Sequence, residues 1–383
     1  MEHTLQLLFC FLFIYSFSEA LANRDKTVLP VKVYIYGLLM VTTRYETMSM
    51  MAIACLLLAF RNQWWKAISL GVFSLLPVIG FGLFAMSKGS FFMPNSVLLK
   101  SGMPPLTLEG LSNFFLNIFR YRLLFVLQDY NFLTAQRLLL ILPLVYLLFL
   151  DAIQQRPAYG HTLIILMGAV LGHVCFAYYS PYPRYEAYLV GCSLVVMGTL
   201  AVQHGREVLV KRIKDAEWIA WSLLGILAIP LLFRCTNAFG NAGQSCMNIY
   251  DQQYQMAKFV HAYYNDAPIA FNDIGAVSYC SEGPKLDLVG IASLDILKSK
   301  RLHYWSPAFA ESISHRRGVK VAILYERCFD PGLLHRWNKI ASWQIRNNVI
   351  EVDDSVSFYS IDTTNMACCE KTWRPSSLHC PRV

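Results

Sequence analysis

Long apolar runs recur along the first two thirds of the chain and restrict the folds that it can adopt. They occupy residues 4–22, 31–60, 67–86, 137–151, 161–177, 187–203 and 218–233. A helix needs about 20 apolar residues to cross the hydrocarbon core of a bilayer, and several of these runs approach that length. The sequence therefore predicts a mainly α-helical polytopic membrane protein with about six to eight membrane segments.

The composition agrees with this class and excludes one kind of partner. The chain is 55% hydrophobic and 15% charged, with a mean hydropathy of +0.39. Soluble domains carry about 25% charged residues. Much of the net charge of +8 lies in short loops, where basic residues set the orientation of membrane helices. We therefore expect contacts with membrane lipids and no binding of nucleic acid.

The basic loops predict which side of the membrane each segment faces. Arg61 with Lys66, then Arg156, then the basic residues of 206–214 mark three cytoplasmic segments. The chain must cross the membrane and return between these cytoplasmic segments. Residues 87–136, residues 179–186 and everything after Arg234 are therefore predicted to lie on the extracytoplasmic side. The expected location is the cell (inner) membrane, multi-pass, with an extracytoplasmic or periplasmic C-terminal domain.

Three regions follow from this pattern. Residues 1–30 are a signal-like segment or the first membrane helix, and the lack of a positive charge before Leu5 favours an uncleaved helix. Residues 31–233 form a transmembrane domain with an outer loop over 87–136. Residues 234–383 form an extracytoplasmic α/β domain with seven of the 11 cysteines. In this domain we expect a helix over 248–264 and strands at 268–272, 286–289, 319–325 and 356–361.

The polar segment Thr43–Glu46 interrupts the apolar run 31–60. Two interpretations stay open: a hairpin of two short helices with Arg44–Glu46 at its outer tip, or one long tilted helix with an internal ion pair. Charges at membrane depth are costly and usually face a protein interior or a wet cavity. Arg44 and Glu46 therefore form either a functional pair or a purely structural one.

Polar residues from separate segments gather on the predicted outer side. Asn95 lies in a predicted turn, Pro94–Ser96, because proline fixes φ and asparagine bonds its own backbone. The guanidinium of Arg184 suits the phosphate of a lipid-linked substrate, since it can donate two parallel hydrogen bonds. The alternative is an arginine that extends to the headgroups from an aromatic belt. The candidate substrate-binding residues are Arg44, Glu46, Asn95, Lys100, Arg184 and Glu186.

The C-terminal region offers two weaker signals. Cys235 and Cys246 would close a short Gly/Asn-rich loop, so we expect a disulfide there if the region faces an oxidising compartment, with packed free cysteines as the alternative. Asp273 and Asp287 could approach each other at neighbouring strand ends and bind a sugar or a metal there, although solvated aspartates are commoner. We found no motif for a zinc site, a P-loop or a dinucleotide fold, and we predict no metal ligands.

Four segments resemble membrane glycosyltransferases of the GT-C type. They are Gly37–Glu46, Phe92–Lys100, Arg184–Leu189, and Ala270–Ala276 together with Asp287–Gly290. The Pro-Asn-Ser…Lys pattern that ends at Lys100 is the most specific of them. The order of these segments is similar to the bacterial branch of arabinofuranosyltransferase-like and mannosyltransferase-like proteins, and the likeness covers roughly residues 33–300.

The resemblance implies transfer of a sugar from a polyprenyl-phosphate-linked donor to an extracytoplasmic glycan, lipid or protein acceptor. It implies that Lys100, Arg184 and Arg44 bind the donor phosphate or line its cavity, that Asn95 orients the loop, and that Glu46 and Glu186 are polar partners. The catalytic residue is not assigned, and the cofactor is unknown, with a divalent metal left open.

One departure from the family weakens the enzymatic interpretation. Only about forty residues precede Thr43, too few for several spanning helices, so we expect the N-terminal catalytic portion with its acidic outer loop to be missing. Two alternatives therefore stay open. One is a catalytically inactive remnant whose outer domain binds glycan or a partner, and the other is a transporter of a lipid-linked sugar.

Overall fold

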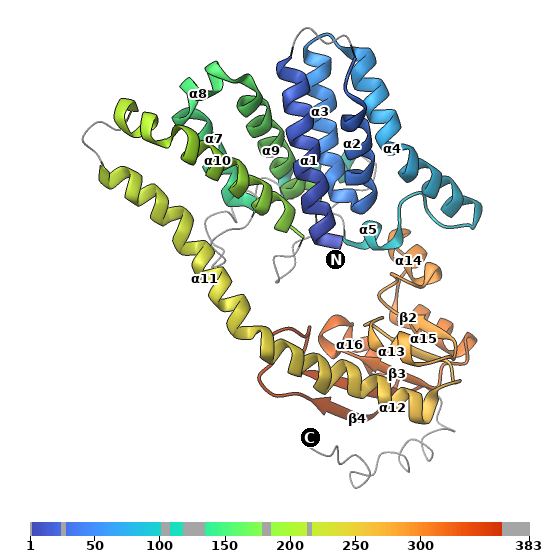
Figure 1. The fold of residues 1–383 in the computed structure, drawn as a ribbon. Helices are drawn as coiled ribbons and strands as arrows, with labels where there is room; N and C mark the ends of the chain where they lie inside the picture. Colours follow the sequence, from blue (N-terminus) through green and yellow to red (C-terminus); the bar gives the residue numbers. More distant parts are fainter. Residues whose placement is uncertain are drawn as a thin grey trace. The chain divides into compact units, whose positions relative to one another are not determined.

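The computed structural model describes residues 2–23, 28–100, 108–117, 135–177, 185–212 and 217–361. The chain forms two compact units, Met1–Cys235 and Thr236–Val383 (Figure 1). The first is a bundle of helices and the second contains a five-stranded sheet. Arg184 and the tail 362–383 lie outside the described residues.

The helical unit follows the apolar runs closely. Its elements are α1 (Glu2–Ala22), α2 (Val31–Thr43), η1 (Tyr45–Thr47), α3 (Met48–Phe60), α4 (Trp64–Ser87), α5 (Asn95–Lys100), α6 (Leu108–Asn117), α7 (Ala135–Leu148), α8 (Leu150–Gln155), α9 (Pro157–Phe176), α10 (Ala187–Arg212) and the first part of α11 (Glu217–Ile249). The buried side chains of α1, α3, α9 and α10 belong to one apolar core.

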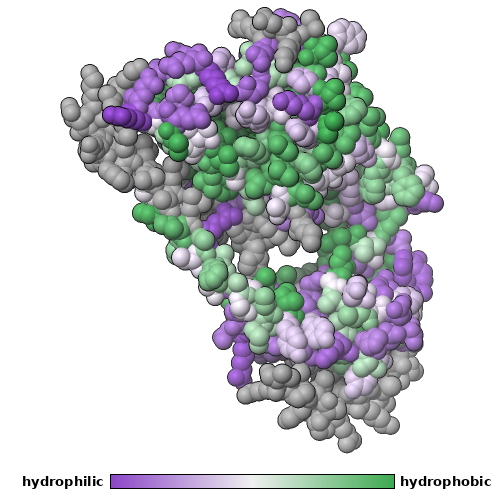
Figure 2. Space-filling view, viewed as in Figure 1, coloured by the Kyte–Doolittle hydropathy of each residue, from purple (hydrophilic) through white to green (hydrophobic). Residues whose placement is uncertain are grey.

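Among the described residues, four helices are long and apolar enough to cross a membrane. They are α1, α4, α9 and Ala187–Val208 of α10, and three shorter apolar helices accompany them. On α4, Trp65 is 84% exposed and Phe84 is 59% exposed, as expected for side chains that face lipid. Figure 2 shows apolar residues over much of the visible surface of this unit. The chain is thus consistent with a helical membrane protein, while the predicted six to eight segments stay a prediction.

The run 31–60 is a hairpin, and a single long helix is wrong. Arg44, between α2 and η1, forms an ion pair with Glu2 at the start of α1. Arg61, just after α3, donates to the carbonyl of Leu21 at the end of α1. Glu2 and Leu21 lie at opposite ends of α1, so Arg44 and Arg61 also lie at opposite ends of it. α2 and α3 therefore run in opposite directions.

Small residues let α9 approach α3 closely. A Cβ atom added at Gly168 would lie 2.5 Å from Cγ1 of Ile53, and one added at Gly172 would lie 2.5 Å from Cβ of Ser49. The two glycines are four residues apart, so they lie on one face of α9. This spacing of small residues is typical of close helix packing in membranes, where van der Waals contact drives association.

The sheet of the second unit has the strand order β2-β1-β3-β5-β4. Its strands are β1 (Ile269–Phe271), β2 (Lys285–Asp287), β3 (Val321–Leu324), β4 (Asn338–Gln344) and β5 (Ser355–Ser360). β1 is parallel to both β2 and β3, while β5 is antiparallel to β3 and β4. The strands expected at 268–272, 286–289, 319–325 and 356–361 therefore overlap observed strands, and β4 is an additional one.

Helices cover both faces of this sheet. Side chains of α12 (Gln255–Tyr264) and α13 (Ala276–Cys280) share a core with Val321 and Ile323 of β3. Side chains of α14 (Leu294–Arg301), α15 (Pro307–Arg316) and α16 (Pro331–Leu334) share another core with Ala322 and Leu324. Alternate residues of a strand point to opposite faces, so β3 is buried on both sides. The unit is a three-layer α/β/α fold.

The expected Cys235–Cys246 disulfide is absent from the structure. Both thiols are free and exposed, and both residues lie within α11. Eleven residues of helix extend about 16 Å, whereas bridged cysteines have Cα atoms less than about 7 Å apart. The prediction was wrong because it assumed a loop in a segment that continues the helix.

The close packing of α9 on α3 gives a direct test of this arrangement. We expect Gly168→Ala and Gly172→Ala each to lower the free energy of unfolding by about 1–3 kcal/mol, because the added methyl overpacks the interface. Gly198→Ala in α10 is the matched control, since a Cβ there meets no atom within 4 Å. Alanine has the higher helix propensity, so this control should keep or slightly raise stability. Thermal unfolding in detergent measures all three, and equal effects at the three positions would contradict the packing.

Candidate functional site

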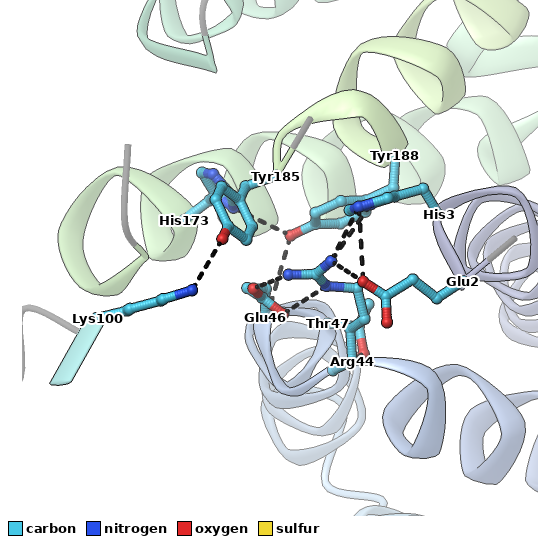
Figure 3. Close-up of polar contacts among 9 residues, drawn as sticks. All are labelled: Glu2, His3, Arg44, Glu46, Thr47, Lys100, His173, Tyr185 and Tyr188. Atoms are coloured by element: carbon cyan, nitrogen blue, oxygen red, sulfur yellow. Dashed lines mark hydrogen bonds and ion pairs between the residues drawn. The ribbon is translucent and has the colours of Figure 1, made fainter. Parts of the chain in front are cut away.

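The tip of the α2–α3 hairpin carries a charged cluster built around Arg44. The guanidinium donates from Nη2 to Oε1 of Glu46 at 2.8 Å and from Nε to Oε2 at 3.2 Å. From Nη1 it donates to Oε1 of Glu2 at 2.9 Å. Figure 3 shows that Arg44 lies between the two carboxylates, with the His3 ring beside them. Arg44 and Glu46 are largely buried, since their side chains are 11% and 22% exposed.

Local backbone contacts hold this tip in place. Arg44 has an extended backbone, φ −159° and ψ 139°, which ends α2. The hydroxyl of Thr47 lies 2.9 Å from the carbonyl of Met40 and 2.8 Å from that of Arg44, so it bonds back to the end of α2. Ser49 donates to the carbonyl of Glu46 at 2.9 Å. These short polar side chains satisfy backbone oxygens that a helix end leaves unpaired, as a membrane requires.

Helices α9 and α10 supply the neighbouring aromatic groups. The hydroxyl of Tyr188 lies 3.4 Å from the carbonyl of Glu46 and 3.5 Å from Nδ1 of His173. Both rings are almost inaccessible, at 1% and 2% exposure. Tyr185 places its ring 4.9 Å from the guanidinium carbon of Arg44, a cation–π contact. Lys100 at the end of α5 donates to the hydroxyl of Tyr185 at 3.4 Å.

The structure brings some of the predicted residues together and separates others. Arg44, Glu46 and Lys100 meet through Tyr185 at one end of the helical unit (Figure 3). Glu186 belongs to another ion pair, with its Oε1 3.3 Å from Nη1 of Arg234, and it is 4% exposed. Arg184 lies outside the described residues.

Asn95 has a different local setting from the one predicted. It begins the short helix α5, with Pro94 just before it, instead of lying in the middle of a turn. The carbonyl of Pro94 accepts from the backbone N–H groups of Val97 and Leu98, both at 3.0 Å. Oδ1 of Asn95 accepts from the hydroxyl of Ser90 at 3.4 Å. Asn95 therefore helps to connect α5 to the chain that follows α4.

Glu2, His3, Tyr185 and Tyr188 were not among the predicted site residues. Glu2 and His3 lie at the start of the first apolar run, so a prediction of which side of the membrane that end faces could have included them. Tyr185 is the middle residue of an Arg-Tyr-Glu triplet of which only the charged members were singled out. In the structure, this tyrosine makes the contacts to Arg44 and Lys100.

The two cations of the cluster, Arg44 and Lys100, differ in how many N–H donors they have left for a ligand. Arg44 already uses Nε and both Nη atoms on Glu46 and Glu2, so its main effect is to fix the hairpin tip. Lys100 has three N–H donors, and its hydrogen bond to Tyr185 is long. Lys100 can therefore donate to an anionic group. Among the described residues, no three His, Cys, Asp or Glu side chains group to hold a metal.

An apolar groove lies on the same helices as the cluster. Its volume is about 330 Å³, and its lining residues come from α3, α7 and α9: Ile53, Leu139, Pro143, Ile164, Met167, Gly168 and Leu171. Ile53 lies one helical turn after Ser49, which contacts the carbonyl of Glu46. On α3 the groove therefore begins about two helical turns from the charged cluster. A polar end and an apolar groove at this separation suit an amphiphilic ligand with a long apolar chain.

Comparison with known proteins adds one finding. Residues 247–359 match a family described as a domain of unknown function, DUF8728. The match covers most of the α/β unit and less than half of the chain. Neither the curated proteins nor the solved structures include a match to this chain.

The Arg44 clamp makes a testable contribution to stability. Arg44→Ala removes hydrogen bonds to two carboxylates and leaves the half-buried Glu46 unpaired, so we expect the free energy of unfolding to fall by about 1–3 kcal/mol. Arg317→Ala is the control, because Arg317 pairs with Asp295 where both side chains are over 40% exposed. That pair should contribute less than about 1 kcal/mol.

A double-mutant cycle of Arg44→Ala with Glu46→Gln, followed by thermal unfolding in detergent, measures the coupling. Additive effects of the two substitutions would show that the pair does not act as a unit.

Proposed function

We propose that this chain is a membrane glycosyltransferase-like protein that uses a polyprenyl-phosphate-linked sugar as donor. The acceptor would be an extracytoplasmic glycan, lipid or protein. The observation that supports the proposal is the charged cluster of Arg44, Lys100 and Tyr185 together with the apolar groove on α3, α7 and α9, which begins about two turns farther along α3. The proposed donor has the same two parts, an anionic phosphate next to a long apolar chain.

In this proposal Lys100 binds the donor phosphate. A lysine acts on phosphate as a point charge, and it can replace its long hydrogen bond to Tyr185 with one to a phosphate oxygen. Arg44, whose charge is balanced by Glu46 and Glu2, lines the site and fixes the hairpin tip. Arg184 is proposed as a further phosphate ligand, because it precedes Tyr185 directly and its guanidinium can donate two parallel bonds.

The proposal includes a multi-pass topology. The polar end with Arg44 and Lys100 would face the extracytoplasmic side, and the end with Arg61 and Arg156 would face the cytoplasm. The excess of basic residues in the loops near Arg61, Arg156 and Arg206 supports this orientation. A donor made on a polyprenyl lipid would then reach the site from the outer leaflet.

A second candidate function rests on the carboxylates of this unit. Glycosyl transfer needs a general base for the acceptor hydroxyl. Glu46 and Glu186 are each engaged in an ion pair with an arginine, which lowers their value as bases. This favours the alternative in which the chain binds the donor or a glycan without transferring the sugar itself.

Replacing Lys100 tests the donor binding that both candidates share. We expect Lys100→Gln to weaken binding of polyprenyl phosphate by about tenfold or more, because one charge-assisted hydrogen bond contributes about 1.5–3 kcal/mol. The control is Lys88→Gln, since Lys88 follows α4 on an exposed surface. Retention of radiolabelled polyprenyl phosphate by the full chain in nanodiscs measures the affinity.

A transfer assay with labelled polyprenyl-phosphate sugars completes the test. Transfer by the wild type with a raised KM for the donor in Lys100→Gln supports an enzyme. Binding without transfer supports the second candidate. A wild type that retains no polyprenyl phosphate rules out both.

A further inference from the structure

A second polar cluster lies within the α/β unit, at the carboxyl ends of β1 and β3. The amide nitrogen Nε2 of Gln253 lies 2.9 Å from Oδ2 of Asp273, 2.9 Å from the hydroxyl of Tyr325 and 3.2 Å from Oε2 of Glu351. The Tyr325 hydroxyl donates to Oε1 of Gln252 at 2.7 Å. Side chains from a helix, two strand ends and the β4–β5 loop thus meet at one point.

The topology of the sheet makes this point a natural binding position. β1 lies between β2 and β3 and is parallel to both. The chain leaves β1 toward α13 on one face, and it leaves β3 through η5 (Glu326–Cys328) toward α16 on the other. Connections that diverge in this way mark a topological switch point, and α/β proteins commonly bind ligands at the strand ends there. The register pairs Phe271 with Ile323, which places Asp273 beside Tyr325.

A π-helical turn supplies the two glutamines. Residues Tyr250–Tyr254 form η4 between α11 and α12, and such turns are frequent at functional sites. Gln252 and Gln253 are buried there, at 0% and 5% exposure. Gln252 also donates to the carbonyl of Asp353 at 3.0 Å, which ties the β4–β5 loop to the helix.

The cluster has an excess of acceptors and of negative charge. Oε1 of Gln253 and Oε1 of Glu351 are buried and have no hydrogen-bond partner among the described residues. Asp273 accepts from Gln253 and from the backbone N–H of Gly275, and Glu351 accepts from Gln253. The Tyr325 hydroxyl, whose proton goes to Gln252, lies 3.4 Å from Oε2 of Glu351. No lysine or arginine of the described chain pairs with these two half-buried carboxylates. Buried acceptor atoms without a partner are costly. Burial, with the nearby charge of Asp273, raises the pKa of Glu351 above its usual range.

We propose that this cluster binds one hard divalent cation, of which Ca²⁺ fits best, through Asp273, Glu351 and the amide oxygen of Gln253. Ca²⁺ takes carboxylate and amide oxygens in flexible geometry and completes its shell with water. A half-turn of the Gln253 amide exchanges Nε2 and Oε1, which turns the oxygen toward Asp273, Glu351 and Tyr325. Only two of the ligands are carboxylates, in keeping with the finding that the described residues contain no group of three His, Cys, Asp or Glu. The all-oxygen donor set suits a hard cation better than a transition metal. This site is separate from the proposed donor site.

The test uses the full chain in a non-ionic detergent after removal of metals. We expect one saturable Ca²⁺ site with a dissociation constant of about 10⁻⁴ to 10⁻³ M, the range of weak extracellular sites. Equilibrium dialysis with ⁴⁵Ca²⁺ measures it. Asp273→Asn and Glu351→Gln should each weaken binding by at least about tenfold, because each removes one charged ligand. Asp266→Asn is the matched control, since it removes an exposed carboxylate of the same unit and should leave binding unchanged.

A second variant locates the ion even if a carboxylate variant fails to fold. Bound Tb³⁺ should show luminescence sensitised by Tyr325, whose hydroxyl contacts the cluster. Tyr325→Phe should reduce that luminescence and keep Ca²⁺ binding within about threefold, because both carboxylates remain.

Two results would overturn the proposal. One is a wild type with no saturable Ca²⁺ site up to several millimolar, and the other is Ca²⁺ affinity that neither carboxylate variant changes.

Discussion

A charge in the hydrocarbon core of a bilayer is costly, and this cost governs where polar groups lie in the helical unit. Arg44, Glu46 and Glu2 meet at one end of α1. At the other end of α1, Arg61 donates to Leu21, and its Nη2 lies 2.7 Å from Nε2 of His161. Arg156 pairs there with Glu19. The helices between these ends present mainly apolar side chains to one another and to the surroundings.

This separation gathers charged groups from several helices at one end of the helical unit. The hairpin tip, the end of α5 and the residues just before α10 meet there as charged and aromatic groups. Within this set, Arg44 is committed to structural contacts and Lys100 is the more available cation. Uncharged polar side chains such as Ser74 are also buried farther along the helices.

Much of the fold was predictable because hydrophobic pattern depends on local sequence. The apolar runs correspond to the helices, and four β-branched segments correspond to strands. β4 was missed because its residues, Asn338–Gln344, are mostly polar and its position at the sheet edge leaves them exposed or half-exposed. The predicted domain start at 234 lies next to the division after Cys235. The Cys235–Cys246 loop was wrong because glycines and asparagines there are tolerated within α11.

The sites were less predictable, since they depend on contacts between distant segments. Arg44 and Glu46 are neighbours in sequence, and their pairing was one of the options that the sequence left open. The contact of Lys100 with Tyr185 joins residues 85 positions apart. Asp273 was noted with Asp287 as a strand-end pair, yet Asp287 accepts from the backbone N–H groups of Val289 and Ala292 in its own loop. Asp273 instead meets Glu351, a partner that no local pattern indicates.

The π-helical turn η4 sets the rotation of α12 relative to the residues before it. A π-turn contains one residue more than the α-helical turn that it replaces. It offsets the helix phase by about 100°. With this offset, Met256, Phe259 and Val260 of α12 face the sheet while Gln252 and Gln253 reach the polar cluster. Deletion of one residue within η4 would make the helix more regular and bring these two faces out of phase.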